Sequence, residues 1–152
     1  MSSDRNPQSS PTAAVKGERP AKTAGMRHVA LFVPDLAAAC FFYVDLLGMQ
    51  IEWQPDADNI YLCSGNDNVA LHHRPESPSL DPAAQRLDHI GFIIDNIDDV
   101  DVWYDLLRAN NVKMKSEPRT HRDGARSFYC QDPAGIIVQI IYHPPISGQA
   151  FG

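Results

Sequence analysis

Two stretches of the chain, HVALFVPDLAAACFFYVDLLG over residues 28–48 and HIGFIIDNIDDVDVWYDLLR over residues 89–108, decide the fold. Both open with a histidine, continue with an alternating apolar run and end in an apolar-striped segment, and they begin 61 residues apart. A short alternating run predicts a strand, whereas a longer stripe with helical spacing predicts a helix. Each stretch therefore predicts a strand followed by a helix, and the sequence as a whole predicts two copies of one small module.

The strand and helix open each module, and three further strands complete it. In the first module Asp35 is the expected N-cap of the helix and Gly48 its end. Its remaining strands are predicted at 50–54, 59–63 and 69–73. The second module is predicted to have a strand at 89–94, a helix from Asn96 to Leu107 and strands at 112–115, 127–130 and 136–142. The sequence thus predicts an α+β protein of two βαβββ modules that pair into a curved mixed sheet around a central cleft.

Segments without apolar periodicity flank and divide these modules. Residues 1–25 are rich in Ser, Pro, Ala and charge, a composition that predicts a disordered tail. A Pro-rich stretch from Arg74 to Gln85 is typical of a linker. We therefore expect a folded domain over 26–145, made of modules 26–75 and 86–145, and a C-terminal tail over 146–152.

The composition argues against several classes of function. A formal net charge of −6 disfavours nucleic acid as a partner, because that affinity comes from basic side chains. No stretch approaches the roughly 18 apolar residues of a membrane span, and no secretory signal is evident, so we expect a cytoplasmic protein without a membrane partner. Three cysteines without C-x-x-C spacing argue against a disulfide framework and a zinc knuckle. A small-molecule partner fits this composition better.

Four polar side chains are predicted on the strand face that turns away from the helices. Side chains alternate between the two faces of a sheet, which places His28 and His89 on that face at the start of each module. The same alternation places His72 and Gln139 there on the last strands. These two become equivalent positions of the repeat once about six extra residues are allowed for in the second module. Folding about a pseudo-twofold axis is expected to bring all four side chains together.

Three imidazoles that converge on a cleft indicate a site for a divalent metal ion. Imidazole binds Fe, Mn, Ni, Co and Zn alike, so the sequence does not identify the metal. Three histidines and one amide carry no charge, and a bound divalent ion would therefore favour an anionic substrate. Two alternatives stay open, since a strand histidine is often structural and His73 replaces His72 if the strand register slips by one residue.

These features resemble the vicinal oxygen chelate superfamily, which includes glyoxalase I, extradiol dioxygenases and bleomycin-resistance proteins. The resemblance spans about residues 26–145 and rests on HVALFVPDL with FFYVDLLGM, on LDHIGFIID and on DPAGIIVQIIYH. In many members a residue of the first strand, one of the fourth strand, a histidine of the fifth strand and a glutamate of the last strand hold the metal. The resemblance implies these roles for His28, His72, His89 and Gln139.

The resemblance implies a metal-dependent dioxygenase, lyase or isomerase that acts on a small oxygenated, anionic metabolite by metal chelation of substrate oxygens. It also implies a homodimer. Gln139 departs from the family pattern, because an amide offers a ligating oxygen but neither charge nor a proton acceptor. The departure leaves an alternative function open, a metal-free protein that sequesters a small molecule as bleomycin-resistance proteins do.

Basic side chains gather in the segment that lengthens the second module. They are Arg119, His121, Arg122 and Arg126, and they surround an Asp-Gly pair that is typical of a tight turn. An arginine folded over the cleft would hold a carboxylate or phosphate with two hydrogen bonds. We expect this cluster to contact substrate, and a solvated, charge-balanced hairpin is the alternative.

Overall fold

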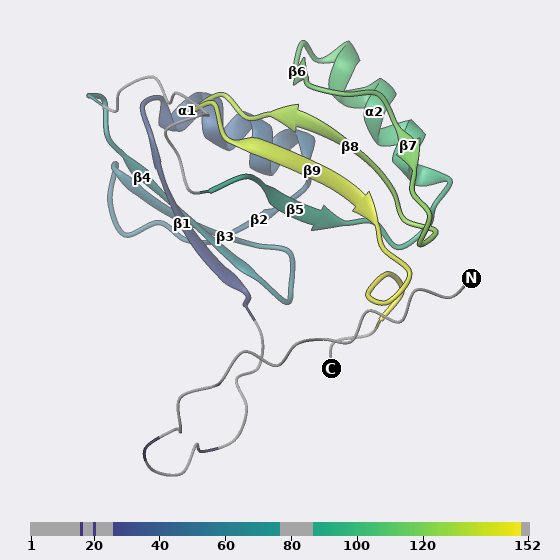
Figure 1. Cartoon of the computed structure of the whole chain (residues 1–152). Coiled ribbons are helices and arrows are strands. Elements are labelled where there is room, and N and C mark those ends of the chain that lie inside the picture. The colour runs from purple at the N-terminus through teal and green to yellow at the C-terminus, as the bar shows by residue number, and fades with distance from the viewer. Residues whose placement is uncertain (1–15, 17–19, 21–25, 77–86, 150–152) are drawn as a thin grey trace.

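The computed structural model describes residues 16, 20, 26–76 and 87–149 (Figure 1). The first module comprises β1 (His28–Val33), α1 (Leu36–Cys40), η1 (Phe41–Leu46), β2 (Gln50–Trp53), β3 (Asn59–Cys63) and β4 (Asn68–His73). The second comprises β5 (Ile90–Ile93), α2 (Asp99–Ala109), β6 (Lys113–Met114), β7 (Arg119–Thr120), β8 (Arg126–Gln131) and β9 (Ile137–Tyr142). The α+β fold is confirmed, with one additional short strand, β7. The expected N-terminal tail and most of the expected linker lie outside the described residues.

Each module forms its own mixed sheet. Sheet A has the strand order β1-β4-β3-β2, and sheet B has the order β5-β9-β8-β6, with β7 beside β8. The first strand of each module runs parallel to the last strand and antiparallel pairs make up the rest. β1 and β5 are consequently edge strands. Figure 1 shows the two sheets side by side, with α1 behind their junction and α2 over sheet B.

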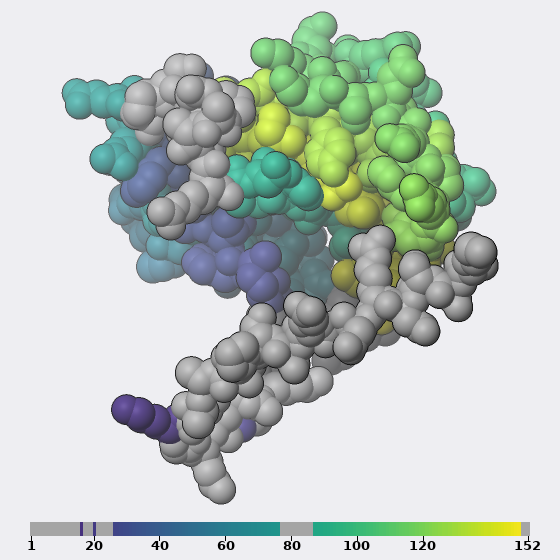
Figure 2. Space-filling view, viewed as in Figure 1, coloured from purple at the N-terminus to yellow at the C-terminus, as the bar shows by residue number. Residues whose placement is uncertain are grey.

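One face of each sheet is packed and the other is open. Leu31 and Val33 of β1 and Val138 and Ile140 of β9 are buried, as the alternation predicts. Residues of both modules belong to one apolar cluster. In Figure 2 the side chains of the first module, in purple to teal, meet those of the second, in green to yellow. We call the side of each sheet that turns away from this cluster its open face.

The first helix begins at its predicted cap and changes its winding midway. The Asp35 carboxylate accepts a hydrogen bond from the backbone N–H of Ala38 at 3.0 Å, which satisfies a free donor of the first turn. The helix continues from α1 into the wider π-helical turns of η1. Gly48, with φ of 81°, follows its end. The expected boundaries are thus confirmed, whereas the π-helical winding was not predicted.

A buried hydrogen bond joins the two modules. The hydroxyl of Tyr43 in η1 donates to the Asp132 carboxylate, in the turn between β8 and β9, at 2.6 Å. Burial raises the pKa of the Asp132 carboxyl above its ordinary value of 3.8, although the bonds from Tyr43 and from the backbone N–H of Ile136 act in the opposite direction. The ring of Tyr43 also lies 6.2 Å from that of Phe92 in β5. These contacts hold η1 against the second module.

The cysteines serve as packing residues. All three are free thiols, with Cys130 buried and the other two half-buried. Burial, followed by the nearby Asp132 carboxyl, raises the pKa of the Cys130 thiol to about 12, so this side chain stays protonated at neutral pH. Within the described residues no helix is long and apolar enough to cross a membrane.

Candidate functional site

The two module-opening histidines and Gln139 lie at comparable places on the open faces. His28 is the first residue of β1, and His89 immediately precedes β5. Gln139 lies directly opposite Gly91 in the β5–β9 pair. A Cβ at Gly91 would lie 3.8 Å from the Gln139 Oε1, which is an ordinary contact, and Gln139 itself is half-buried.

The register places His72 two residues beyond the position that matches Gln139. Ala30 and Gly91 are equivalent in the repeat, and Ala30 pairs with Ala70 whereas Gly91 pairs with Gln139. Ala70, and not His72, is therefore the structural counterpart of Gln139. The predicted equivalence is wrong by two residues, and one of the two arises because the turn that joins β3 to β4 is one residue shorter than the turn that joins β8 to β9. As a metal ligand, His72 stays a prediction.

The pairing of β1 with β4 also shows which of His72 and His73 lies on the open face. His72 lies opposite Phe32, which is 59 % exposed, and His73 lies opposite Val33, which is fully buried. His72 therefore belongs to the open face, as the alternation predicts. Rings on this face form a row across sheet A, with centroids 6.3 Å apart for Phe32 and His72, 6.0 Å for His72 and Tyr61, and 5.2 Å for the stacked pair of Tyr61 and Trp53. Such a row offers a surface on which an aromatic molecule can stack.

Histidines on sheet A are held by asparagines across the strand. The Nδ1 atom of His28 lies 2.7 Å from the Asn68 Oδ1, and Asn68 donates from Nδ2 to Glu52 at 2.7 Å. The Nδ1 atom of His72 lies 2.6 Å from the Asn59 Oδ1. In both cases the other ring nitrogen, Nε2, points away from the hydrogen-bonded partner.

A second polar group occupies the open face of sheet B. Gln139 donates from Nε2 to the Ser127 hydroxyl and to the Tyr129 hydroxyl, both at 3.1 Å. The ring of Tyr129 meets that of His89 edge-on at 5.2 Å. The Nδ1 atom of His89 lies 2.5 Å from a carboxylate oxygen of Asp88. Tyr129 thus connects the two candidate ligands of the second module.

The candidate ligands are divided between the two sheets, and within sheet A the β1–β4 register places His28, opposite Asn68, four residues away from His72. Among the described residues, no three His, Cys, Asp or Glu side chains lie close enough together to hold a metal ion. The convergence of His28, His72, His89 and Gln139 on one point therefore stays a prediction. The donors themselves suit a transition metal, because neutral imidazole nitrogens and an amide oxygen are common ligands.

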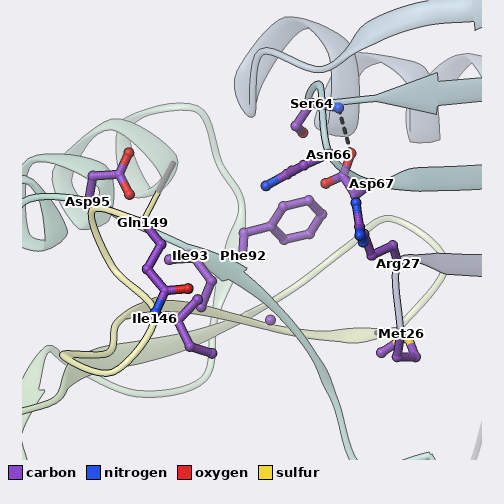
Figure 3. A pocket seen from close by; sticks show the side chains of 11 residues that line it. Met26, Arg27, Ser64, Asn66, Asp67, Phe92, Ile93, Asp95, Ile146 and Gln149 are labelled. Carbon is purple, nitrogen blue, oxygen red and sulfur yellow. Dashed lines mark hydrogen bonds between the residues drawn. The ribbon is translucent and has the colours of Figure 1, made fainter. Parts of the chain in front are cut away.

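A cavity lies at the junction of the modules (Figure 3). Its volume is about 630 Å³. It is lined by residues from the segment before β1, the turn between β3 and β4, β5 and the chain after β9, among them Arg27, Asp67, Gly91, Phe92 and Asp95. Figure 3 shows the Phe92 ring between Asp67 and Asp95. The lining includes Arg27, which precedes His28, and Gly91, which lies opposite Gln139, but none of the four candidate ligands themselves.

The four basic residues of the second module divide between two faces. Arg126 shares its strand face with buried Phe128 and binds both carboxylate oxygens of Asp101 in α2, at 2.8 and 2.7 Å. Arg119, by contrast, lies opposite Ser127 on the side of the open face, and the His121 Nε2 is 3.2 Å from the Ser127 hydroxyl. Arg122 is exposed in the turn. Arg126 is therefore engaged with the helix, and contact of this cluster with substrate stays a prediction.

Comparison with known proteins decides the family. Residues 25–140 match the Glyoxalase/Bleomycin resistance protein/Dioxygenase superfamily. The chain belongs to this superfamily. The resemblance to vicinal oxygen chelate proteins is thereby confirmed, and so is their mixed α+β architecture.

Relatives within the superfamily include dioxygenases and a structure of almost the same length. The chain is 32 % identical to 3-methylcatechol 2,3-dioxygenase of Pseudomonas putida over 124 residues, which cover 76 % of this chain and 40 % of that enzyme. It is 27 % identical to a manganese-dependent 2,3-dihydroxybiphenyl 1,2-dioxygenase of Geobacillus genomosp. 3, over 80 % of this chain and 38 % of the enzyme. A glyoxalase/dioxygenase from Nostoc punctiforme has the same fold, with a TM-score of 0.72, 22 % identity and coverage of 87 % and 99 % of the two chains. The chain thus spans about two fifths of the length of these dioxygenases.

Several residues on the open faces of the two sheets were not predicted from the sequence. Asn59, Asn68, Ser127 and Tyr129 contact the candidate ligands from neighbouring strands. Their spacing along the chain carries no signal, because cross-strand contacts depend on the register. With the register known, Asn59, Asn68 and Tyr129 are found directly opposite their partners, and Ser127 lies two residues along β8 from Tyr129.

Proposed function

We propose that the protein is a metal-dependent enzyme that acts on a small oxygenated aromatic molecule. Superfamily membership, together with the equivalent placement of His28 and His89 at the start of the two modules, carries this proposal. His28, His89 and Gln139 are the proposed metal ligands, and His72, which lies two residues beyond the counterpart of Gln139, is proposed to contact the substrate instead. Two imidazoles and one side-chain oxygen resemble the set of two histidines and one carboxylate found in non-haem iron oxygenases.

The proposed ligands belong to both modules, so the site requires that the β1 and β5 edges come together. This assembly occurs by closure within one chain or between two copies of it, and we favour a homodimer. The metal, when bound, acts as a Lewis acid that polarises oxygen atoms of the substrate. Because Gln139 is neutral, the ion keeps its full charge and binds an anionic form of the substrate more strongly than a neutral form.

The ring row of sheet A supports an aromatic substrate. Phe32 and Tyr61 flank His72 on the open face, where the Arg74 guanidinium covers one side of the Phe32 ring at 4.6 Å and Trp53 stacks on Tyr61. The exposed rings of Phe32 and Trp53 suit a planar ligand. Two relatives bear names that specify 3-methylcatechol and 2,3-dihydroxybiphenyl, which are aromatic diols. We propose an aromatic diol as substrate, with His72 Nε2 as the acceptor of a hydroxyl proton and with Arg119 and His121 at the rim.

Metal analysis of protein purified without a histidine tag tests this proposal. After incubation with Mn²⁺ or Fe²⁺ and gel filtration, the wild type should retain close to one ion per site, and His28→Ala and His89→Ala should lose it. Gln139→Glu should bind the ion more tightly, because a carboxylate adds charge to the donor set. His73→Ala is the matched control on the packed side of β4 and should retain the metal. A wild type without bound metal, or His28→Ala with a full complement, contradicts the proposal.

A second candidate function, metal-free binding of a small molecule, is favoured by the contacts of Gln139. Both amide hydrogens of Gln139 are used by Ser127 and Tyr129, as in a purely structural residue. Calorimetric titration with an aromatic diol separates the two functions. Affinity that is unchanged by EDTA supports sequestration, whereas affinity that EDTA abolishes supports the metal-dependent enzyme.

A further inference from the structure

Two short chains of hydrogen bonds with the same chemistry cross the open face of sheet A. In each, a carboxylate binds the amide group of an asparagine, and the asparagine oxygen faces a histidine Nδ1. The first runs from Glu52 through Asn68 to His28, with both contacts at 2.7 Å. The second runs from Asp56 through Asn59 to His72, with amide contacts of 2.9 and 3.0 Å and an imidazole contact of 2.6 Å.

Strand pairing brings the members of each chain together. Asn68 lies directly opposite His28 in the β1–β4 pair, and Asn59 lies directly opposite His72 in the β3–β4 pair. Residues that face each other across two strands project to the same side of the sheet. Both asparagines are therefore held at the open face by the same register that places the histidines there.

The carboxylate determines the direction of every bond in the chain. An ionised carboxylate only accepts hydrogen bonds, so each asparagine must turn its N–H₂ group toward it. Hydrogen bonds from the backbone N–H of Asp58 and from Asn59 lower the pKa of the Asp56 carboxyl, so this group is an acceptor at neutral pH. The asparagine oxygen then faces the imidazole, and because that oxygen also only accepts, Nδ1 must carry a hydrogen. In a neutral histidine this leaves the lone pair on Nε2.

We propose that Glu52 with Asn68, and Asp56 with Asn59, are positioning pairs that hold His28 and His72 in the Nδ1–H form and turn both Nε2 lone pairs to the open face. Metal-binding histidines commonly donate their second ring N–H in this way. The use of these lone pairs, by a metal at His28 and a substrate proton at His72, rests on the proposed function. The form of the imidazole does not, since the hydrogen bonds of the metal-free protein fix it.

The alternative is that these contacts only support the sheet. Cross-strand polar pairs contribute to sheet stability whatever the protonation pattern of the ring. The chain offers a matched comparison in Asp58, which lies 3.1 Å from the Nδ1 of His73 on the packed side of β4. Asp58 makes the same type of contact with a histidine that has no proposed role.

Long-range ¹H–¹⁵N NMR on the metal-free protein at about pH 8, where histidines are neutral, tests the inference directly. His28 and His72 should both be Nδ1–H in the wild type. Asn68→Ala should convert His28 alone to predominantly Nε2–H, the form that an unrestrained imidazole prefers in water, and Asn59→Ala should convert His72 alone. Asn68→Asp combined with Glu52→Gln should keep His28 in the Nδ1–H form, because the new amide can donate to one carboxylate oxygen while the other still accepts from Nδ1. Asp58→Ala should change neither.

Titration with Co²⁺ supplies a second readout, which separates this inference from the proposed function. If the wild type binds Co²⁺, Asn68→Ala should weaken binding roughly 10- to 100-fold, the range typical of such supporting contacts. Unchanged affinity in a variant that has lost the Nδ1–H form overturns the positioning role of Asn68. A wild type that does not bind Co²⁺ contradicts the metal site, while NMR still decides the form of the imidazoles. An Nε2–H His28 in the wild type, or in Asn68→Asp combined with Glu52→Gln, overturns the inference.

Discussion

At the scale of single residues, two aspartates of the second module titrate in opposite directions for opposite physical reasons. Asp101 is exposed on α2, and its hydrogen bonds to Arg126 lower the pKa of its carboxyl. Asp132 is buried below the turn between β8 and β9, and loss of water raises the pKa of its carboxyl despite the bonds it accepts. Their surroundings therefore make opposite contributions to the dependence of stability on pH.

The two aspartates give a paired prediction. A lowered pKa in the folded state stabilises the protein above the ordinary pKa and loses that contribution as pH falls. A raised pKa has the reverse effect, so stability falls as pH rises above the ordinary pKa of 3.8. Relative to Asp132→Asn, the wild type should lose up to about 1.4 kcal/mol of unfolding free energy per pH unit within the window that begins near pH 4. Relative to Asp101→Asn, the wild type should gain unfolding free energy as pH rises. The total gain should be less than about 1 kcal/mol, because the ion pair of Asp101 with Arg126 is exposed.

Urea unfolding of the three proteins from about pH 3 to about pH 7, the range that spans the ordinary carboxyl values, measures both differences. Asn is the appropriate replacement at position 132, since its Oδ1 still accepts from the backbone N–H groups of Ala134 and Ile136. If the difference in unfolding free energy between wild type and variant changed with pH in the same direction for both variants, the opposite pKa shifts of Asp101 and Asp132 would be contradicted.

Single residues also show what the sequence predicts well. Strand alternation placed His28, His72 and Gln139 on the correct face, because a face depends only on whether a residue number is odd or even within a strand. It did not predict that Arg126 turns to α2, although Arg126 and the apolar Phe128 share a strand face. The positioning asparagines were missed because their partners are 40 residues away for Asn68 and 13 for Asn59.

At the scale of elements, the hairpin of β7 and β8 is the largest addition to the repeat. Its turn depends on Gly124, whose φ of 86° places it in the left-handed region, and on the Asp123 carboxylate, which accepts from the N–H of Ala125 at 3.0 Å. The hairpin brings Arg119 and His121 beside Ser127 on the open face. The turn conformation thus determines where these side chains lie.

Substitution of two glycines tests the role of this turn. Gly124→Ala should lower the free energy of unfolding by about 1 to 2 kcal/mol, because an L side chain is strained at positive φ. Gly91→Ala is the matched control, since its nearest neighbours would lie 3.8 Å from the new Cβ, an ordinary contact. It should change stability by less than about 0.5 kcal/mol. Thermal and urea unfolding of both variants measure these effects, and equal losses would contradict the argument.

Elements differ in how far the sequence specifies them. The longer strands were predicted to within one residue of their observed ends, because each is an apolar-rich run bounded by turn residues. β7 has only two residues, too few for any alternation to show. The repeat equivalence of His72 and Gln139 was wrong by two residues, since an even shift leaves every side chain on its face and the apolar pattern unchanged.

At the scale of the whole molecule, one hydrogen bond indicates how firmly the modules are joined. Tyr43→Phe removes the hydroxyl that binds the buried Asp132 carboxylate and should cost roughly 1.5 to 3 kcal/mol, the range for a hydrogen bond to a charged group. Tyr104→Phe is the control, because the ring of Tyr104 packs edge-on against Phe128 at 5.4 Å, and it should cost less than about 0.5 kcal/mol. Equilibrium unfolding measures both, and a second transition in Tyr43→Phe would show that the modules unfold separately.

The difference of two residues between His72 and the counterpart of Gln139 has a consequence for how a duplicated protein diverges. After duplication, the apolar sides of both copies remain constrained by the core they share. On the other side, a functional residue can arise at a different position of the same strand, but only two residues away, because a residue one position away points into the core. Ala70 and His72 are one such step apart. Two copies of an ancestral module can thus acquire unlike chemistry while their packing stays alike, and the duplicated fold becomes a source of new activities.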